Sequence, residues 1–466
     1  MGFHNLIISY SNKKSIKLFL ILKIRFFLTF LYNSKYNLVG DINLEKIKEK
    51  AVNTKLYPIY KMFSFDLLFY YSIIYLFLTQ VKGLSPANVV LADSCYVLFR
   101  VILLLPLTAL VEKIGKRNSI ITANIILAIS ILTFILSQNF TVIIIANIFE
   151  AFGFVIKNIS ESNLLYDSLP NNSVRGNIFS KIEGRGSALY YFLNALSALA
   201  SGFLYIVNGY LPLIICLIMC LVSAFIATKF KDVVSVSNSN QIRAKDYAKN
   251  LKYAFKNLFK SSRLRNLIFF GSLVSGLLSL LMTIRSGLLQ ELNVPEQYFG
   301  IIFGVLEFIS GISAGYQFAL HKRFRNKTLS IISLPVSIAC LIIGLTVFFT
   351  PPYAITMTIV LIMFLIQYSC RAPFYNLIKQ YLNNFTTSRL RNKISSAYTL
   401  VEGISRAFIS FMASLLLNIV SVSISFIFVG CIFTIVFVLF LDHMRKKVGL
   451  KPDEYKKKDI EFLELK

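Results

Sequence analysis

The sequence predicts an all-α polytopic membrane protein with twelve transmembrane helices in two six-helix bundles. Twelve apolar stretches alternate with short polar turns, and a long basic segment separates the sixth stretch from the seventh. The mean hydropathy of +0.66 and the 56% hydrophobic content exceed those of an ordinary soluble domain. Because roughly 20 apolar residues span the hydrocarbon core as a helix, twelve spans fit within 466 residues.

The predicted spans follow one another with short connections. They are expected near Leu56–Leu78, Ala87–Val111, Ser119–Ser137, Phe140–Ser160, Gly184–Val207, Leu211–Phe230, Leu267–Gln290, Gln297–Leu320, Leu329–Phe349, Ala354–Lys379, Ile394–Leu417 and Val422–Leu441. The corresponding domains are an N-terminal extension (1–55), a first bundle (56–230), a linker (231–265), a second bundle (266–441) and a tail (442–466).

The basic turns alternate with turns that carry almost no charge. Lys113, Lys116 and Arg117 follow the second span, and ten Lys or Arg against two acids lie between residues 229 and 265. The turns on the other side hold only Lys82 as a basic residue. Lys- and Arg-rich short loops stay in the cytoplasm. This asymmetry predicts a bacterial plasma-membrane protein with both termini inside, and it accounts for the net charge of +27 without nucleic acid.

The linker and the N-terminal extension leave alternatives open. Tyr247, Leu251, Phe255 and Leu258 recur at helical spacing between lysines, which fits either a helix on the anionic inner leaflet or a solvated linker helix. Within the extension, the apolar stretch 16–32 is interrupted by Lys17, Lys23 and Arg25. We interpret it as a surface or disordered extension that need not belong to the protein, with a thirteenth span as the alternative.

The turn after the second span carries a recognisable motif. It reads Glu112, Lys113, Ile114, Gly115, Lys116, Arg117, in which Gly permits a tight turn and the acid can pair with a cation. This turn resembles the loop signature of the major facilitator superfamily, although that signature has Asp in place of Glu112. The resemblance implies a conformational latch at Glu112, Gly115, Lys116 and Arg117, to which we add a Glu112–Lys157 ion pair as a hypothesis.

Two further segments are similar to one group of bacterial exporters in that superfamily. They are residues 161–169, with Leu-Leu-Tyr-Asp-Ser-Leu, and residues 391–396 at the start of the eleventh span. The resemblance covers residues 56–445 and implies two bundles around a central cavity, with alternating access. It also implies that the first, fourth, seventh and tenth spans line the cavity.

Charged residues inside the spans mark candidate sites, because a charge at mid-bilayer is costly unless it is paired or hydrated. The candidates for proton coupling or for the substrate cavity are Asp66, Arg100, Glu150, Arg285, Glu307, Arg371, Glu402 and Arg406. The alternative is internal neutralisation, since Asp93 with Arg100 and Glu402 with Arg406 are close enough along a helix to pair. Asp66, Glu150 and Glu307 are the preferred proton sites, and the arginines could instead bind an anionic ligand.

The remaining chemistry is bounded by what the sequence lacks. It has no Gly-rich phosphate loop and no grouped His, Cys or carboxylate ligands, which predicts a non-enzyme without metal or cofactor. We expect a monomeric, proton-coupled carrier of a small amphipathic solute or drug, acting outward as an antiporter. The alternatives are an importer of a sugar or organic anion, and a membrane scaffold or sensor that transports nothing.

Overall fold

The computed structural model describes residues 44–170, 175–232, 262–324, 328–351, 354–384 and 388–444. The chain divides into two compact units, Met1–Lys48 and Glu49–Lys466. All elements from α3 onward lie in the second unit, and α2 crosses the boundary. The predicted amphipathic helix at residues 247–258 and the apolar stretch at 16–32 lie outside the described residues.

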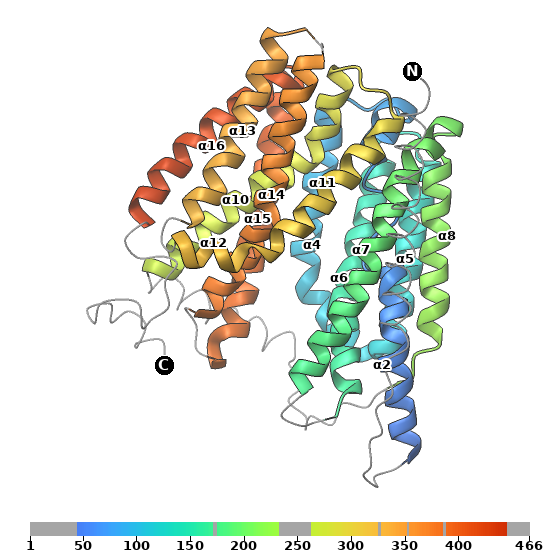
Figure 1. Cartoon of the computed structure of the whole chain (residues 1–466). Helices are drawn as coiled ribbons and strands as arrows, with labels where there is room; N and C mark the ends of the chain where they lie inside the picture. Colours follow the sequence, from blue (N-terminus) through green and yellow to red (C-terminus); the bar gives the residue numbers. More distant parts are fainter. Residues whose placement is uncertain are drawn as a thin grey trace, which may run out of the picture. The chain divides into compact units, whose positions relative to one another are not determined.

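Helices account for nearly all of the described chain, and these residues contain no strand. The first half of the second unit holds α2 (Leu44–Ser64), α3 (Ile74–Leu76), the π-helical η1 (Phe77–Val81), α4 (Pro86–Ile114), α5 (Lys116–Leu136), α6 (Phe140–Ser168), α7 (Arg175–Val207) and α8 (Leu211–Thr228). The second half holds α10 (Ser262–Glu291), α11 (Gln297–Gly315), α12 (Gln317–Phe324), α13 (Thr328–Phe349), α14 (Ala354–Asn384), α15 (Ser388–Leu417) and α16 (Val422–Met444) (Figure 1).

The predicted multi-pass membrane protein is confirmed. Within the described residues, ten helices are long and apolar enough to cross a membrane. The segments that correspond to the first and eighth predicted spans are shorter or interrupted: α11 is a shorter apolar helix, and the first span is broken. Most predicted boundaries agree with the helices, but α7 begins at Arg175 rather than Gly184, and α6 continues to Ser168 rather than Ser160.

The first span is not the continuous helix that the sequence predicts. The α-helix ends at Ser64, residues 65–73 form bends and turns, and helical structure resumes at Ile74. Two local features favour the break. The Asp66 carboxylate accepts a hydrogen bond from the Leu67 backbone N–H, which competes with the helical pattern. Phe69 has a φ of 62°, in the left-handed region that bulky residues rarely adopt.

The polar turns cap the helices they connect. The Ser85 hydroxyl accepts from the Asn88 N–H at the start of α4, and the Asn139 side chain does the same for α6. Gly115 joins α4 to α5 with a φ of 87°, which glycine adopts without the steric cost that a side chain would add. The positive φ at this turn therefore explains why the motif has glycine at position 115.

Lys82, the exception to the charge asymmetry, has a local role. Its Nζ donates to the backbone carbonyls of Ile135 and Ser137, each at 2.8 Å, at the C-terminal end of α5. The ammonium also lies over the rings of Phe77 and Tyr210. A cation at a helix C-terminus satisfies carbonyls that the helix leaves unpaired. Lys82 thus caps the C-terminus of α5. Its presence on the side with few basic turns does not contradict the membrane orientation that the other loops predict.

Close backbone contacts join the two halves. Helix α4 packs on α15, and α7 packs on α11. Where α7 meets α11, a side chain at Gly300 would collide with the Ala198 carbonyl, and one at Gly202 would come within 2.7 Å of the Gln297 carbonyl. Gly300 thus permits a backbone approach that any larger residue would prevent.

These contacts gather at the end with few basic turns, which we call the basic-poor end (residues 79–85, 137–139, 208–210, 292–296, 350–351 and 418–421). Gln80 Nε2 donates to Glu296 Oε1 at 2.9 Å, and Gln290 Nε2 donates to Thr79 at 3.0 Å. The Ser414 hydroxyl donates to the Ala87 carbonyl at 2.9 Å. The interface between the halves is therefore closed at the basic-poor end.

The connectivity predicts that turns at opposite ends are reached from opposite faces of the membrane. Asn208 and Asn118 are matched positions, since both are exposed asparagines at helix ends: Asn208 follows α7, and Asn118 lies in the first turn of α5, next to Gly115. In a background without the six native cysteines, we expect a membrane-impermeant thiol reagent to label Asn208→Cys in intact cells and Asn118→Cys only after permeabilisation. Labelling of both from one face would contradict an odd number of crossings between them.

Candidate functional site

The break in the first span places irregular backbone among the spanning helices. Such backbone is tolerated at membrane depth only where it is buried in protein or lines a hydrated cavity. Here it carries Asp66, whose Oδ1 accepts from the Tyr71 hydroxyl at 2.8 Å, and Tyr70, whose side chain is buried. Interrupted helices form the binding sites of many transporters. This segment is the first component of the candidate site.

Glu150 of α6 lies against this segment. Its side chain is 3% exposed, and Oε2 accepts a hydrogen bond from the Tyr70 hydroxyl at 3.1 Å. Within the described residues, no Lys or Arg lies within ion-pair distance of it. Burying an ionised carboxylate without a cation is costly, so this environment accommodates the neutral acid more readily than the anion. Glu150 is therefore a buried acid without an ion-pair partner among the described residues, and its predicted role in proton coupling stays a prediction.

Arg100 does not pair with Asp93 as the internal-neutralisation alternative required. The Arg100 guanidinium donates to the Tyr96 hydroxyl at 3.2 Å and lies 5.8 Å from the Phe154 ring. Asp93 instead accepts from the Thr283 hydroxyl of α10 at 3.2 Å, across the interface between the halves. The helical spacing allowed the Asp93–Arg100 pair, but Arg100 bonds to Tyr96 one turn away on α4, and Asp93 bonds to Thr283 on α10.

The pairing of Glu402 with Arg406 fails in the same way. Glu402 Oε1 accepts from the Ser275 hydroxyl at 2.5 Å, and Arg406 Nη2 donates to Ser279 at 2.9 Å. Both serines are on α10, so the two charged residues of α15 are used to bind α10. These two candidates lie at a helix contact inside the second half.

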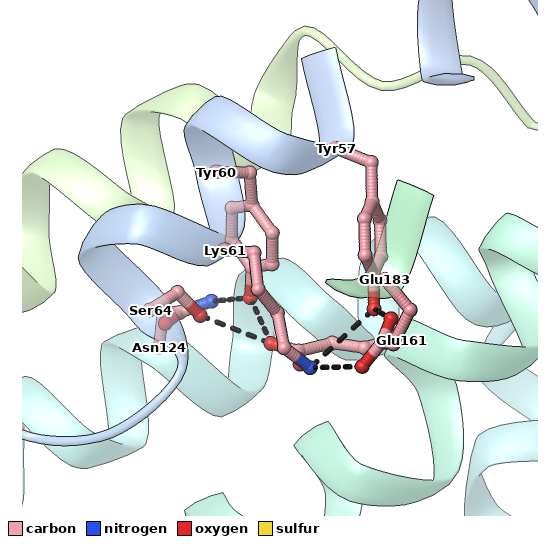
Figure 2. A network of polar contacts seen from close by, with 7 residues as sticks. All are labelled: Tyr57, Tyr60, Lys61, Ser64, Asn124, Glu161 and Glu183. Atoms are coloured by element: carbon pink, nitrogen blue, oxygen red, sulfur yellow. Dashed lines mark hydrogen bonds and ion pairs between the residues drawn. The ribbon is translucent and has the colours of Figure 1, made fainter. Parts of the chain in front are cut away.

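A buried polar network in the first half was not predicted. The Lys61 cluster consists of Tyr57, Tyr60, Lys61, Ser64, Asn124, Glu161 and Glu183 (Figure 2). The Lys61 ammonium lies 2.9 Å from Glu183 Oε1 and 3.4 Å from Glu161 Oε2. The cluster thereby joins α2, α6 and α7.

Hydroxyl groups complete the network around Glu161. Tyr60 donates to Glu161 Oε1 at 2.6 Å, and Ser64 donates to the same oxygen at 3.0 Å. Glu161 is 2% exposed. A buried carboxylate is stable only when a cation and hydrogen-bond donors surround it, and this one has both. Figure 2 shows the side chains converging on that carboxylate.

The sequence held a signal for this cluster. Tyr57, Tyr60, Lys61 and Ser64 recur at the spacing of one helix face, and Glu161 follows Glu150 by eleven residues, which is three turns of a helix. The signal was missed because the first span was taken to begin at Leu56, which put Lys61 near the membrane edge. Helix α2 in fact begins at Leu44.

The Glu112–Lys157 ion pair is wrong. Lys157 is 1% exposed, and its ammonium lies 5.0 Å from the Phe154 ring centre inside the first half. Glu112 is exposed at the end of α4, where partial desolvation raises the pKa of its carboxyl and the Lys116 charge opposes that rise. The two residues face different environments because α4 ends beyond the packed interior.

The motif cations have other partners. Lys116 forms an ion pair with Asp167 at the end of α6. Arg117 donates to the Thr228 carbonyl at the end of α8, at 2.7 Å, and lies 3.8 Å from Asp232. The turn thus fastens α5 to α6 and α8 within the first half. Its role as a conformational latch stays a prediction.

The second half contributes an ion pair and a buried arginine that has no ion pair among the described residues. Arg371 Nη1 of α14 lies 2.7 Å from Glu307 Oε1 of α11. Arg285 of α10 is buried, with its guanidinium 3.9 Å from the Phe303 ring centre and 5.2 Å from that of Tyr368. Of the predicted acids, Glu307 is therefore paired with a cation. Among the described residues, Asp66, Glu150 and Glu402 have hydroxyl partners and no Lys or Arg within ion-pair distance; of these three, Glu150 is the buried one.

The comparisons with known proteins agree with this architecture. A family model described as the Major Facilitator Superfamily matches residues 57–410. The chain belongs to this superfamily. Members are transporters, so the chain is a membrane transport protein by family. Comparison of the sequence with curated proteins gives no match.

Several solved structures of the superfamily share the fold. The nucleoside transporter NupG has a TM-score of 0.61 at 13% identity, with 89% of this chain and 100% of that chain covered. A D-xylose–proton symporter has 0.62 at 13%, with 87% and 98% covered. A POT family transporter in complex with 5-aminolevulinic acid has 0.64 at 12%, with 86% and 96% covered. At these identities the likeness establishes the major facilitator fold alone.

The Lys61 cluster predicts a strong and specific effect on stability. Lys61→Met leaves Glu161 buried without its cation, which costs about 3–5 kcal/mol. We expect a large fall in the unfolding temperature of the purified protein, measured by thermal scanning in detergent. The matched control is Lys116→Met, which breaks a more exposed ion pair and is expected to cost about 1 kcal/mol or less.

The double variant Lys61→Met/Glu161→Gln separates pairing from packing. We expect it to recover a good part of the lost stability, because no unpaired charge remains on Glu161. If the double variant loses as much stability as the two single variants together, Lys61 and Glu161 do not act as an energetically coupled pair.

Proposed function

We propose that this protein is a proton-coupled secondary transporter that moves a small amphipathic solute across the plasma membrane by alternating access. The single observation that carries the proton coupling is Glu150, a buried acid whose described polar partner is the Tyr70 hydroxyl. A proton can bind there without leaving a charge in the low-dielectric interior.

The position of Glu150 supports coupling rather than a purely structural role. The Tyr70 hydroxyl that binds it belongs to the broken part of the first span, and Tyr71 in the same segment binds Asp66. Protonation of Glu150 changes which of its oxygens can accept and adds an O–H donor. A change at one acid therefore alters the hydrogen bonding of the segment that would move or bind solute.

The closed basic-poor end supports alternating access. The contacts that seal it are short-range hydrogen bonds and glycine-mediated backbone approaches between the halves. Each is made between surfaces of separate six-helix halves, so a relative rotation would break them together. This state would correspond to the one that faces the cytoplasm, given the predicted orientation.

The surroundings of Asp66 support an amphipathic solute. Phe65 stacks on Tyr190 with ring centres 4.7 Å apart, and Tyr191 and Tyr71 both keep exposed surface. Aromatic walls with hydroxyl tips bind molecules that have both an apolar body and polar groups. The fold also accommodates proton coupling, as the similar D-xylose–proton symporter illustrates. The direction of transport, predicted as export, stays a prediction.

The test is transport in cells that lack their own pumps. A panel of dyes, drugs and metabolites would be followed with and without the protein, with the proton gradient intact and collapsed. For the solute that responds, we expect Glu150→Gln to reduce gradient-driven transport on the order of tenfold or more, because an amide cannot exchange the proton. Asp232→Asn, at an exposed carboxylate, is the control and should transport normally.

Two results would contradict the proposal in different ways. Full gradient-driven transport by Glu150→Gln would exclude coupling through this acid and leave a transporter coupled elsewhere. A protein that moves no member of the panel in either condition would favour the alternative of a membrane scaffold or sensor. Counterflow exchange by Glu150→Gln, with net transport lost, would be the clearest support, since exchange does not require a proton to be released.

A further inference from the structure

Arg285 is a buried cation with two nitrogen atoms that form no hydrogen bond to the described residues. The residue is only 5% exposed. Nε and Nη1 are both buried, and neither has a hydrogen-bond partner among the residues that the structure describes. A guanidinium stays charged in proteins and has no acceptor, so these N–H groups can be satisfied only by an acceptor that comes to them.

The packing around Arg285 orients it without neutralising it. The Phe303 and Tyr368 rings lie 3.9 and 5.2 Å from the guanidinium carbon. Cation–π contacts stabilise the charge through the faces of the guanidinium plane and leave its N–H edges free. Rings on both helices α11 and α14 thus fix the position of a cation that still lacks an anion.

The neighbouring charges leave this region net positive. Glu307 is the acid close to Arg285, and its Oε1 is already engaged by Arg371 at 2.7 Å. Two arginines therefore share one carboxylate. A buried excess of positive charge is costly and favours an incoming anion.

The ion pair beside Arg285 keeps exposed surface and lies near the other half. The side chains of Glu307 and Arg371 are 36% and 26% exposed, although both lie in spanning helices. Tyr191 of α7, in the other half, is exposed as well and lies close enough to interact electrostatically with Glu307 and Arg371. A solute between the halves could therefore contact this ion pair, with Arg285 close by.

We propose that Arg285 and Arg371 form a subsite for the carboxylate or phosphate group of a small organic anion. The acid group would accept from the unpartnered Arg285 N–H groups, and the apolar part would lie against Tyr368 and Tyr191. This deepens the proposed function and rests on it, because it names the class of the amphipathic solute. Arginine is suited to both acid groups through charge-assisted hydrogen bonds.

The test measures ligand-induced stabilisation of the purified full-length protein in detergent. The probes are benzoate against benzamide and phenyl phosphate against phenol, each pair at equal concentration, so that charge and not ring burial is compared. A ligand that binds the folded state raises the unfolding temperature with concentration. We expect at least one anion to stabilise the protein and its uncharged analogue to do so far less; the two pairs distinguish carboxylate from phosphate.

Three variants assign the effect to the subsite. Arg285→Gln should weaken anion binding on the order of 30-fold or more, because a buried charged partner is lost. Glu307→Gln should strengthen it, since Arg371 is released to the ligand; this opposite sign keeps the test valid if Arg285→Gln folds poorly. Arg323→Gln is the control, as Arg323 also lies over a phenylalanine ring, at 5.4 Å, but is exposed; it should bind like the wild type.

The proposal is overturned if neither anion stabilises the wild type more than its uncharged analogue. It is equally overturned if the Arg285→Gln and Glu307→Gln proteins bind the anions with unchanged affinity. These results are independent of proton coupling. If anions bind in an Arg285-dependent way but the protein transports nothing, the proposed function alone is refuted. If the protein transports uncharged solutes with the gradient, and Arg285→Gln leaves that transport unchanged, the subsite alone is refuted.

Discussion

The cost of placing charge in an apolar interior governs how this structure is held together. Glu161 is buried with a cation and several hydroxyl donors, so the Lys61 cluster can join α2, α6 and α7 without water. The ion pair between Glu307 and Arg371 joins α11 to α14 in the same manner. Such ion pairs hold neighbouring helices together. Each pair specifies one arrangement of its helices, because displacing one partner would leave the other as an unpaired charge.

The two proposed sites each rest on a charge without an ion pair among the described residues. Glu150 has a tyrosine hydroxyl as its partner, and Arg285 lies against aromatic rings. They lie in separate halves, Glu150 beside the broken first span and Arg285 near the partly exposed Glu307–Arg371 ion pair. An acid that is accommodated when neutral and a cation that lacks an acceptor are complementary to a proton and to an anionic solute. Both sites thus follow from the same electrostatic constraint.

The contact between the halves is built differently from the interior of each half. Within the first half, buried ion pairs and side-chain hydrogen bonds dominate. Between the halves, at the basic-poor end, the contacts are uncharged or partly exposed hydrogen bonds and close backbone approaches at Gly202 and Gly300. Such contacts need no buried charge to be separated when they open. The distribution suits two rigid halves that part at one end without losing their own folds.

The sequence alone determined the class of the protein, because the length of apolar stretches and the placement of Lys and Arg depend only on the bilayer. It also singled out Glu150, Arg285 and Arg371 as charges within spans that need an explanation, and their roles in transport are proposals. Only the tertiary structure decided the partners: Glu161 and Lys61 are 100 residues apart, and Asp93 and Arg406 each bond to a residue of α10 instead of to the opposite charge on their own helix. The reason is that partner choice depends on helix rotation and packing, which local spacing does not specify. The break at residues 65–73 likewise arises from contacts made by Asp66 and its neighbours. A hydropathy profile contains no information about such contacts.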